Sequence, residues 1–258
     1  MLTLLNKHAI ITGGSRGIGL AIAHRFAAEG AAVTLVGRDE ARLLAALDGL
    51  PPPAAPVGVS DGGSSLAHAF EAFDVASAHE WGRLADKLKA SKRPVDILVN
   101  AAGVTQNKLL IKGNFSDDQK LVNTNLMGTM YGCATMSKRM IQQKGNRSGC
   151  IINISSLLAI KGGRGASAYA ASKAGIIGLT RSLASEVGQF GIRVNVLLPG
   201  YIQTEMTQML DQKGDLSASI PLGRFGTTEE VADAAAFLAK NSYAHNTVLN
   251  LDGGLSAT

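Results

Sequence analysis

Short and almost continuously apolar runs recur along the chain, and stretches with helical periodicity separate them. Such runs are typical of strands covered on both faces of a sheet, because a strand with one wet face would alternate apolar and polar residues. Seven runs fit this description: Ala9–Ile11, Val33–Val36, Ala69–Phe73, Val95–Val99, Cys150–Ile154, Val194–Leu198 and Thr247–Leu251. They predict a seven-stranded sheet that is buried on both faces.

Amphipathic stretches between these runs predict helices, which are Ile18–Glu29, Ser77–Lys89, Gln119–Met136, Ala168–Val187 and Glu229–Leu238. Alternating strands and helices form βαβ crossovers, so the strands should be parallel. The predicted fold class is therefore α/β, a single-domain, doubly wound Rossmann fold over residues 1–258 with helices on both faces. The proline-rich segment Leu50–Ser65 is too short to separate two domains, and we interpret it as a surface insertion.

The composition excludes several other classes of protein. Hydrophobic residues make up 46% of the chain, enough to build a large core and to exclude wholesale disorder. Two cysteines and five dispersed histidines supply neither a disulfide framework nor a metal site. No apolar stretch approaches the ~20 residues that a membrane span needs, and residues 1–7 are too few for a signal peptide. We expect a soluble intracellular protein, in a compartment (cytoplasm or mitochondrial matrix) that the sequence does not distinguish.

The net charge of +5 raises the question of a polyanionic partner. Basic residues are scattered and interleaved with acidic ones, as in Arg38–Arg42, which favours a solvated surface over nucleic-acid binding. One exception is a group of cations near the end of a predicted helix, namely Lys138, Arg139, Lys144 and Arg147. This group could steer an acidic protein partner, or it could simply stabilise the helix end against its dipole.

A glycine-rich turn, Thr12–Gly19, follows the first strand and opens the first helix. Glycine permits a tight turn and a close approach of backbone to a pyrophosphate, and free N–H groups at a helix start bind phosphate. A glycine-rich turn alone is frequently only a turn, but its position after the first strand favours a dinucleotide site. The predicted cofactor-binding residues here are Gly13, Ser15, Arg16, Gly17, Ile18 and Gly19.

The second predicted strand ends in Gly37–Arg38 where an acidic residue would bind the adenosine ribose of NAD. Gly37 leaves room for a phosphate, and the forked guanidinium groups of Arg38 and Arg16 can bind it. The alternative is that both arginines are merely exposed. Their joint placement favours NADP(H) as the cofactor.

Tyr169 and Lys173 lie four residues apart, on one face of a predicted helix. A lysine ammonium and a cationic nicotinamide would together lower the phenol pKa towards neutrality, so that Tyr169 could exchange a proton. A surface pair is the alternative. Ser156 supports the catalytic interpretation because it follows a strand, and Asn100 and Asn125 add polar groups close to other elements.

These motifs together resemble those of short-chain dehydrogenases/reductases over residues 5–254. The resemblance implies that Tyr169 is the general acid, Ser156 polarises the substrate carbonyl, and Lys173 binds the nicotinamide ribose and assists Tyr169. Asn125 would then hold a proton-relay water. The remaining implied cofactor contacts are Asp74 and Val75 at adenine, Asn100, Ala101 and Gly103 after a strand, and Pro199, Gly200, Ile202 and Thr204 near the nicotinamide amide.

Within that family the chain resembles 3-oxoacyl-[acyl-carrier-protein] reductases and related organellar carbonyl reductases. The resemblance implies NADPH-dependent reduction of a 3-oxoacyl thioester in fatty acid synthesis, an acyl-carrier protein as partner, and a homotetramer. Small residues that would let helices approach closely are Ala170, Ala174, Gly175 and Gly178. Two features depart from the pattern: the Leu50–Ser65 insertion, and Phe190 where bacterial members tend to carry a basic residue.

Two alternatives remain open at this point. The chain could be a general carbonyl, secondary-alcohol or quinone reductase acting on small molecules, or a non-catalytic, NADP(H)-responsive subunit. Retention of both Tyr169 and Lys173 argues against the second. Residues 204–226, with the methionine-containing stretch Thr204–Leu216, are expected to form a mobile lid that covers the substrate.

Overall fold

Seven parallel strands form one sheet in the computed structural model, which describes residues 3–53, 67–143, 148–205, 207 and 215–257. The strand order is β3-β2-β1-β4-β5-β6-β7, and every neighbouring pair is parallel. The strands are β1 (His8–Thr12), β2 (Ala32–Gly37), β3 (Ala69–Ala72), β4 (Ile97–Asn100), β5 (Gly149–Ile154), β6 (Ile192–Pro199) and β7 (Val248–Leu251). The predicted α/β class and seven-stranded parallel sheet are confirmed.

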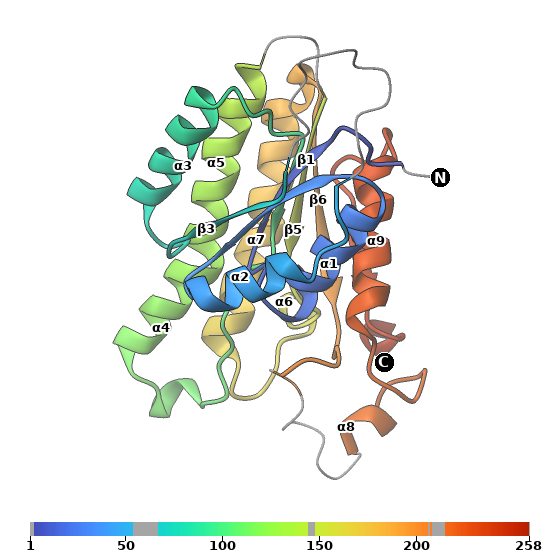
Figure 1. The fold of residues 1–258 in the computed structure, drawn as a ribbon. Helices are drawn as coiled ribbons and strands as arrows, with labels where there is room; N and C mark the ends of the chain where they lie inside the picture. Colours follow the sequence, from blue (N-terminus) through green and yellow to red (C-terminus); the bar gives the residue numbers. More distant parts are fainter. Residues whose placement is uncertain (1–2, 54–66, 144–147, 206, 208–214, 258) are drawn as a thin grey trace.

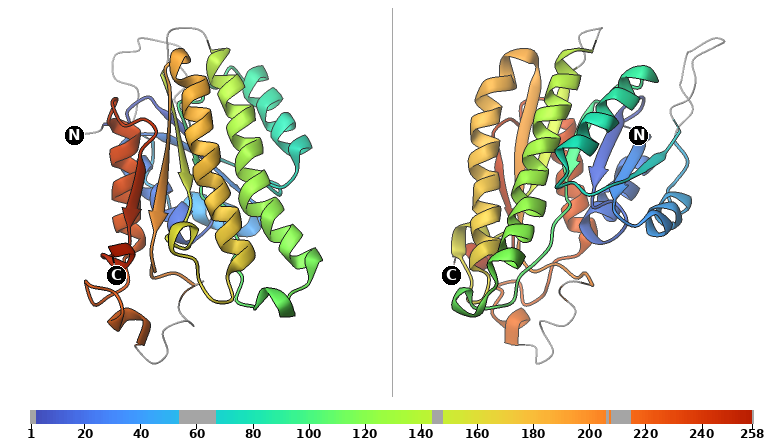
Figure 2. Two further views of the ribbon diagram at one scale, coloured as in Figure 1. Left: turned by 180° about the vertical axis from the view of Figure 1, so that it is seen from behind. Right: turned by 90° about the vertical axis from the view of Figure 1, so that its left-hand side faces the viewer.

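Helices cover both faces of the sheet (Figures 1 and 2). One layer comprises α1 (Gly17–Ala28), α2 (Glu40–Asp48) and α9 (Thr228–Lys240), and the other comprises α3 (Ala78–Ala90), α5 (Gly128–Ile141) and α7 (Ser167–Val187). Shorter helices are α4 (Phe115–Val122), α6 (Leu158–Lys161) and α8 (Asp215–Ala218). The turns η1 (Leu110–Lys112), η2 (Asn123–Met127), η3 (Gly188–Phe190) and η4 (Leu255–Ala257) complete the described elements.

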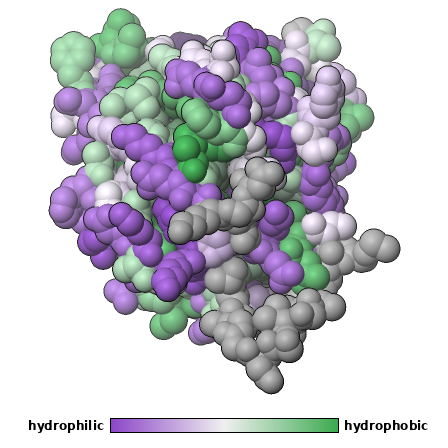
Figure 3. Space-filling view, turned by 90° about the horizontal axis from the view of Figure 1, so that it is seen from above, coloured by the Kyte–Doolittle hydropathy of each residue, from purple (hydrophilic) through white to green (hydrophobic). Residues whose placement is uncertain are grey.

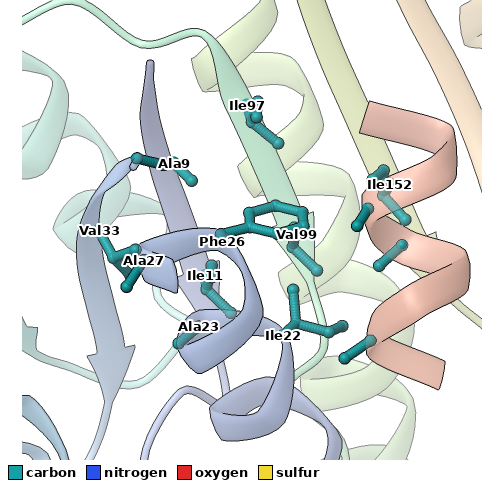
Figure 4. Close-up of a cluster of buried hydrophobic side chains, with 14 of the residues drawn as sticks. Ala9, Ile11, Ile22, Ala23, Phe26, Ala27, Val33, Ile97, Val99 and Ile152 are labelled. Atoms are coloured by element: carbon teal, nitrogen blue, oxygen red, sulfur yellow. The ribbon is translucent and has the colours of Figure 1, made fainter. Parts of the chain in front are cut away.

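Alternate residues of each central strand point to opposite helical layers. Ile11 of β1 packs with Ile22 and Phe26 of α1, and all three are fully buried (Figure 4). The preceding residue, Ile10, belongs to the opposite cluster with Trp81 of α3. Burying one such side chain stabilises the fold by about 1.5–3 kcal/mol. The apolar runs of the sequence are therefore strands that fill two cores.

One predicted helix, Gln119–Met136, is interrupted. The chain forms α4, then the π-helical turn η2, then α5, and the N–H of Gly128 bonds to the carbonyl of Asn123 five residues earlier. Asn125 lies in this turn, fully buried. Its side-chain amide bonds to the backbone of Val104, and this tertiary contact occurs where the helix widens. Periodicity alone does not reveal such a turn.

The surface seen from the end opposite α8 mixes hydrophilic and hydrophobic residues (Figure 3). None of the helices among the described residues is long and apolar enough to cross a membrane. Within the same ranges, no three His, Cys, Asp or Glu side chains gather in a way that could hold a metal ion. Most of the predicted insertion Leu50–Ser65, and residues 206 and 208–214 of the predicted lid, lie outside the described residues.

Candidate active site

The strands all end at the same edge of the sheet, which lies at the lower end in Figure 1. The chain order reverses at β1, because β2 pairs on one side of it and β4 on the other. Ligands of open α/β sheets bind in the crevice outside the strand ends at such a reversal. The glycine-rich turn after β1 lies at this crevice.

Backbone geometry explains the glycines of this turn. Gly13 and Gly17 have φ of +65° and +54°, which residues with side chains rarely adopt. A Cβ on Gly19 would lie 2.3 Å from the carbonyl oxygen of Gly13, so the helix and the turn touch through bare backbone. Ser15 and Ile18 between them are half-buried. The turn therefore presents backbone where a pyrophosphate would lie.

The start of α1 lacks a side-chain cap. Arg16 occupies the N-cap position without a capping hydrogen bond, and no acidic residue lies in the first turn. By contrast, side chains cap α2, α3, α4 and α9, whereas α5 and α7 also begin without a side-chain cap. Unpaired N–H groups with the positive end of the helix dipole favour an anion. The residues present thus fit the diphosphate of a dinucleotide.

A residue outside the predicted set, Thr12, joins this turn to the loop after β4. Its hydroxyl oxygen accepts the N–H groups of Ala101 at 3.0 Å and Ala102 at 3.1 Å. A Cβ on Gly13 would lie 2.9 Å from Ala102. The two loops are therefore held as one surface. The position of a threonine at a strand end was the only sequence signal for this contact.

Asn100 is turned towards the interior. Its side chain is 2% exposed and donates to the carbonyl oxygen of the Asn153 side chain at 2.9 Å and to Cys133 at 3.4 Å. Asn153 in turn donates to Thr180. This network joins β4, α5, β5 and α7. Because the side chain of Asn100 is used in the network, only its backbone groups are left to contact a ribose. Ala101 and Gly103 are half-buried in the loop that follows.

Arg38 and Arg16 lie in different surroundings. Arg38 lines a recess of about 340 Å³ together with Val104, Lys120 and Thr124. Arg16 forms an ion pair with Glu205 at 2.9 Å, with both side chains mostly exposed. Sequence reasoning did not find Glu205 because the two residues are distant along the chain.

The adenine-side residues come from the turn after β3. The carboxylate of Asp74 accepts the N–H of Ala76 at 3.0 Å and remains exposed. Val75 is buried, and its carbonyl accepts the indole N–H of Trp81 at 3.0 Å. Because the Val75 carbonyl already accepts this bond, we expect the backbone contact with adenine to come from the Val75 N–H group.

Ser156, Tyr169 and Lys173 come together at the ends of β5 and α7. Ser156 hydrogen-bonds Tyr169, and the Lys173 ammonium lies 5.8 Å from the centre of the tyrosine ring. Lys173 is 4% exposed and donates to the carbonyl of Ile154 at 2.9 Å. A Cβ on Gly103 would lie 3.4 Å from the lysine nitrogen, so the loop after β4 closes over it. The predicted cluster thus exists, with Ser156 and Lys173 buried and Tyr169 half-buried.

Burial shapes the pKa values of both ionisable members of this cluster. It raises the pKa of Tyr169, which the hydrogen bond with Ser156 partly offsets, and it lowers the pKa of Lys173 to about 8. The sequence predicted a lowered tyrosine pKa with a cationic nicotinamide present. In the chain alone the direction is upward, because desolvation of the phenol outweighs its hydrogen bond with Ser156.

The side-chain amide of Asn125 joins the start of α7 to the loop after β4. Its Oδ1 accepts the N–H of Val104 and its Nδ2 donates to the Val104 carbonyl, both at 2.9 Å. Nδ2 also donates to the Ser172 hydroxyl at 3.2 Å, and that hydroxyl donates to the Tyr169 carbonyl. Ser172 and Ser155, whose hydroxyl donates to the Lys173 carbonyl at 2.7 Å, were not singled out in the sequence.

The end of β6 continues the crevice towards the glycine-rich turn. Pro199 and Ile202 are buried, and the Gly200 N–H donates to Leu251 at 2.8 Å. Thr204 lies beside the glycine-rich turn, where a Cβ on Gly17 would lie 3.7 Å from its methyl group. The residues predicted at the nicotinamide therefore face the residues predicted at the pyrophosphate.

The structure describes part of two surface features that the sequence singled out, the basic group and the small residues of α7. The Arg139 guanidinium donates to the carbonyls of Leu88 and Arg93, so it is not free for a protein partner, while Lys138 is exposed. Lys144 and Arg147 lie outside the described residues. On α7, Gly178 has open space beside it, whereas Gly175 abuts Leu126 of the same chain.

Comparisons with known proteins agree with this geometry. The family model for short chain dehydrogenases matches residues 7–215. The 3-oxoacyl-[acyl-carrier-protein] reductase FabG of Chlamydia muridarum is 41% identical over 259 residues, covering 98% of this chain and 98% of that protein. Human 3-oxoacyl-[acyl-carrier-protein] reductase and Xenopus laevis carbonyl reductase family member 4 are each 39% identical over 251 residues, covering 97% of this chain and 98% of each relative.

A solved structure has the same fold. The crystal structure of a putative gluconate dehydrogenase from Agrobacterium tumefaciens matches with a TM-score of 0.88 and 31% identity, covering 100% of this chain and 98% of that one. The family model, the relatives and the fold agree with one another. The chain therefore belongs to the short-chain dehydrogenase/reductase family of oxidoreductases, whose members use a nicotinamide cofactor.

Proposed function

We propose that this chain reduces the 3-oxo group of an acyl thioester, carried by an acyl-carrier protein or coenzyme A, with NADPH as the reductant. The observation that carries the proposal is the Ser156–Tyr169–Lys173 cluster, in which Ser156 and Lys173 are buried, beside a crevice that fits a dinucleotide. The names of relatives about 40% identical along nearly the whole chain support the choice of substrate class. The product would be a 3-hydroxyacyl thioester, made for fatty acid synthesis.

The mechanism assigns a separate role to each member of the cluster. NADPH, when bound, supplies the hydride for the carbonyl carbon. Tyr169 donates its proton to the carbonyl oxygen, and the hydroxyls of Ser156 and Tyr169 together stabilise the negative charge developing there. Lys173 holds the nicotinamide ribose. Its bond to the Ile154 carbonyl fixes the ammonium below the tyrosine ring.

The raised pKa of Tyr169 keeps its phenol protonated before reduction begins. A phenol whose pKa burial has raised keeps its proton at neutral pH, which is the form that a general acid needs. With a pKa of about 8, Lys173 remains mostly protonated at neutral pH, so a positive charge stays beside Tyr169. Asn125 holds the loop at Val104 in place and, in this proposal, positions the water that returns a proton.

The preference for NADPH rests on Arg16 and Arg38. Arg16 lies within the glycine-rich turn and Arg38 directly follows β2, where neither Gly37 nor Arg38 offers a carboxylate to the ribose of NAD. Two guanidinium groups can bind a 2′-phosphate that NADH lacks. The remaining cofactor contacts proposed are those of the predicted set, with Asn100 acting through its backbone.

A second function has a specific observation in its favour. A relative named carbonyl reductase family member 4 is as similar as the human 3-oxoacyl reductase, so reduction of small ketones or quinones is the alternative. The exposed Phe190 and the inward-facing Arg139 reduce the basic surface available to a carrier protein.

A substrate panel separates the two functions. We would follow NADPH oxidation with acetoacetyl thioesters of acyl-carrier protein and coenzyme A, simple ketones and quinones, with NADH as the cofactor control. The proposal expects the largest kcat/KM for a thioester with NADPH. Higher kcat/KM values for quinones would favour the alternative, and a steady preference for NADH would refute the assignment of the arginines.

Assembly is also proposed rather than observed. We infer a single domain over residues 1–258 that forms a homotetramer, as the family resemblance implies. The exposed Ala174 and Gly178 on α7 leave room for a helix of another subunit to approach. Light scattering at micromolar concentration tests this, and a monomeric mass would refute it.

A further inference from the structure

We propose that Glu205 sets the strength of the preference for NADPH by competing with the 2′-phosphate for Arg16. The inference rests on the proposed function, in which Arg16 binds that phosphate. In the chain alone the guanidinium Nη1 of Arg16 lies 2.9 Å from Oε2 of Glu205. The pair joins the glycine-rich turn to the segment that follows β6.

The surroundings of the two predicted phosphate ligands differ. Arg38 lines an open recess whose other lining residues include Lys120, Asp117 and Asp118, whereas Arg16 is already in direct contact with a carboxylate. The pair is solvent-accessible, with 58% of the Arg16 side chain and 68% of the Glu205 side chain exposed. Exposed pairs of this kind are weak, so a ligand of higher charge can displace Glu205.

A 2′-phosphate carries about −1.5 to −2 charges at neutral pH and can accept a forked guanidinium. A forked contact through both terminal nitrogens of Arg16 needs Nη1, the nitrogen that Glu205 occupies, so the 2′-phosphate of NADPH displaces Glu205, whereas NADH leaves the pair intact. The cost of breaking an exposed pair corresponds to at most about a fivefold change in an equilibrium constant. Glu205 thus reduces the discrimination between the two cofactors by up to that factor.

Glu205 also has an effect that both cofactors share. Its negative charge beside the glycine-rich turn repels the pyrophosphate of NADPH and of NADH alike. The ratio of the two dissociation constants removes this shared effect and isolates the competition for Arg16. Because Thr204 adjoins Glu205 and is proposed to contact the nicotinamide amide, fragments without nicotinamide remove that contact as well.

The test measures dissociation constants of NADP⁺ and NAD⁺, and of 2′,5′-ADP and 5′-AMP, by calorimetry on the whole protein. The variants are Glu205→Gln, Arg16→Ala and the double variant. Glu80→Gln is the control, because Glu80 forms a partly exposed ion pair with Arg83 at 2.7 Å on α3, away from the candidate site. We expect Glu205→Gln to increase the preference for NADP⁺ and for 2′,5′-ADP about two- to fivefold. Glu80→Gln should leave it unchanged.

Each other outcome has a definite meaning. In the Arg16→Ala background, Glu205→Gln should no longer change the preference. Arg16→Ala could weaken NADP⁺ binding while Glu205→Gln leaves the ratio of the two dissociation constants unchanged, or tightens the binding of both cofactors equally. Either result would refute the role of Glu205 and leave the phosphate role of Arg16 in place. If Arg16→Ala leaves NADP⁺ binding intact, both the phosphate assignment and this inference fail.

Discussion

The helices α1 and α9 lie side by side on one face of the sheet, yet their first turns are built in opposite ways (Figure 1). The start of α9 has a complete capping box, in which Thr227 and Glu230 satisfy each other's backbone N–H groups. The start of α1 has glycines and no side-chain cap. One helix start is completed by its own chain, and the other leaves donors for a ligand.

Two ionisable groups outside these helix starts differ in how deeply they are buried. His68 is half-buried and has both ring nitrogens hydrogen-bonded, accepting from the Val33 N–H and bonding to the Pro51 carbonyl. Lys173 is buried and donates to the Ile154 carbonyl. Burial lowers the pKa of both groups, and for Lys173 in the candidate site a ligand can offset part of this unfavourable burial.

The largest expected effect comes from adding a methyl group where α1 meets the glycine-rich turn. Gly19→Ala places a methyl group 2.3 Å from the Gly13 carbonyl, so it should destabilise the protein by about 3 kcal/mol and abolish measurable NADPH binding. Urea unfolding and calorimetry measure the two effects. Gly82→Ala on α3 is the control, because nothing lies within 4 Å of the added methyl group. Normal cofactor binding by Gly19→Ala would contradict the close approach.

Lys173→Met should stabilise the protein while removing activity. Lowering the lysine pKa from 10.5 to about 8 corresponds to roughly 3 kcal/mol, so we expect a gain of about 1–3 kcal/mol at pH 7. The unfolded chain holds the proton up to pH 10.5 and the folded chain only up to about 8. Wild-type stability should therefore rise between these pH values, and the advantage of the variant should fade.

Denaturant titrations at pH 7 and pH 10 test this expectation. A variant that is less stable than the wild type at pH 7 would show that burial of the ammonium is fully compensated. The same variant should still form a folded protein of normal circular dichroism.

Single substitutions can remove the side-chain cap of α9 or add one to α1. Thr227→Ala removes a cap and should cost about 1 kcal/mol of stability without changing NADPH affinity. Arg16→Asp adds a capping side chain to α1, so it should leave stability equal or higher by up to about 1 kcal/mol and reduce NADPH affinity more than tenfold. Thermal unfolding and calorimetry give both quantities. An equal loss of affinity in both variants would remove the distinction between these helix starts.

The smallest effect concerns His68, at the other end of the sheet. Burial lowers the pKa of His68 from 6.5, so protonation favours the unfolded state. The contribution of neutral His68 to stability is fully present above pH 6.5 and is lost as the pH falls below that value. The loss in the free energy of unfolding should be less than about 1 kcal/mol, because the ring is partly exposed. His68→Gln keeps a donor and an acceptor but cannot titrate, so its stability should fall less between pH 7 and pH 5. Identical slopes, with His79→Gln as the exposed control, would contradict this.

The sequence predicts the parts of the fold that depend on local pattern. Apolar runs and amphipathic stretches give the sheet and its flanking helices, and the glycine pattern locates the turn after β1. The π-helical turn at Asn125 was missed, because it depends on a tertiary bond to Val104. The Thr12 bridge and the Arg16–Glu205 pair were missed for the same reason. The orientation of Asn100 depends on Asn153, a residue of the neighbouring strand.

The shift of the tyrosine pKa could not be predicted from spacing either. An i,i+4 pair indicates that Lys173 is near Tyr169, but only the packed structure shows how much both groups are desolvated. The sequence therefore identifies which groups take part, and the burial determines their protonation state.

The most direct test of the proposed chemistry is the Tyr169→Phe variant, which removes one oxygen atom from the cluster. We would measure NADPH binding by calorimetry and turnover of an acetoacetyl thioester, with Tyr243→Phe at a 96% exposed position as the control. The account predicts NADPH affinity within about twofold of the wild type and kcat lower by about 10²–10⁴-fold. Retention of most of the turnover with intact NADPH binding would contradict the role of Tyr169 as the general acid.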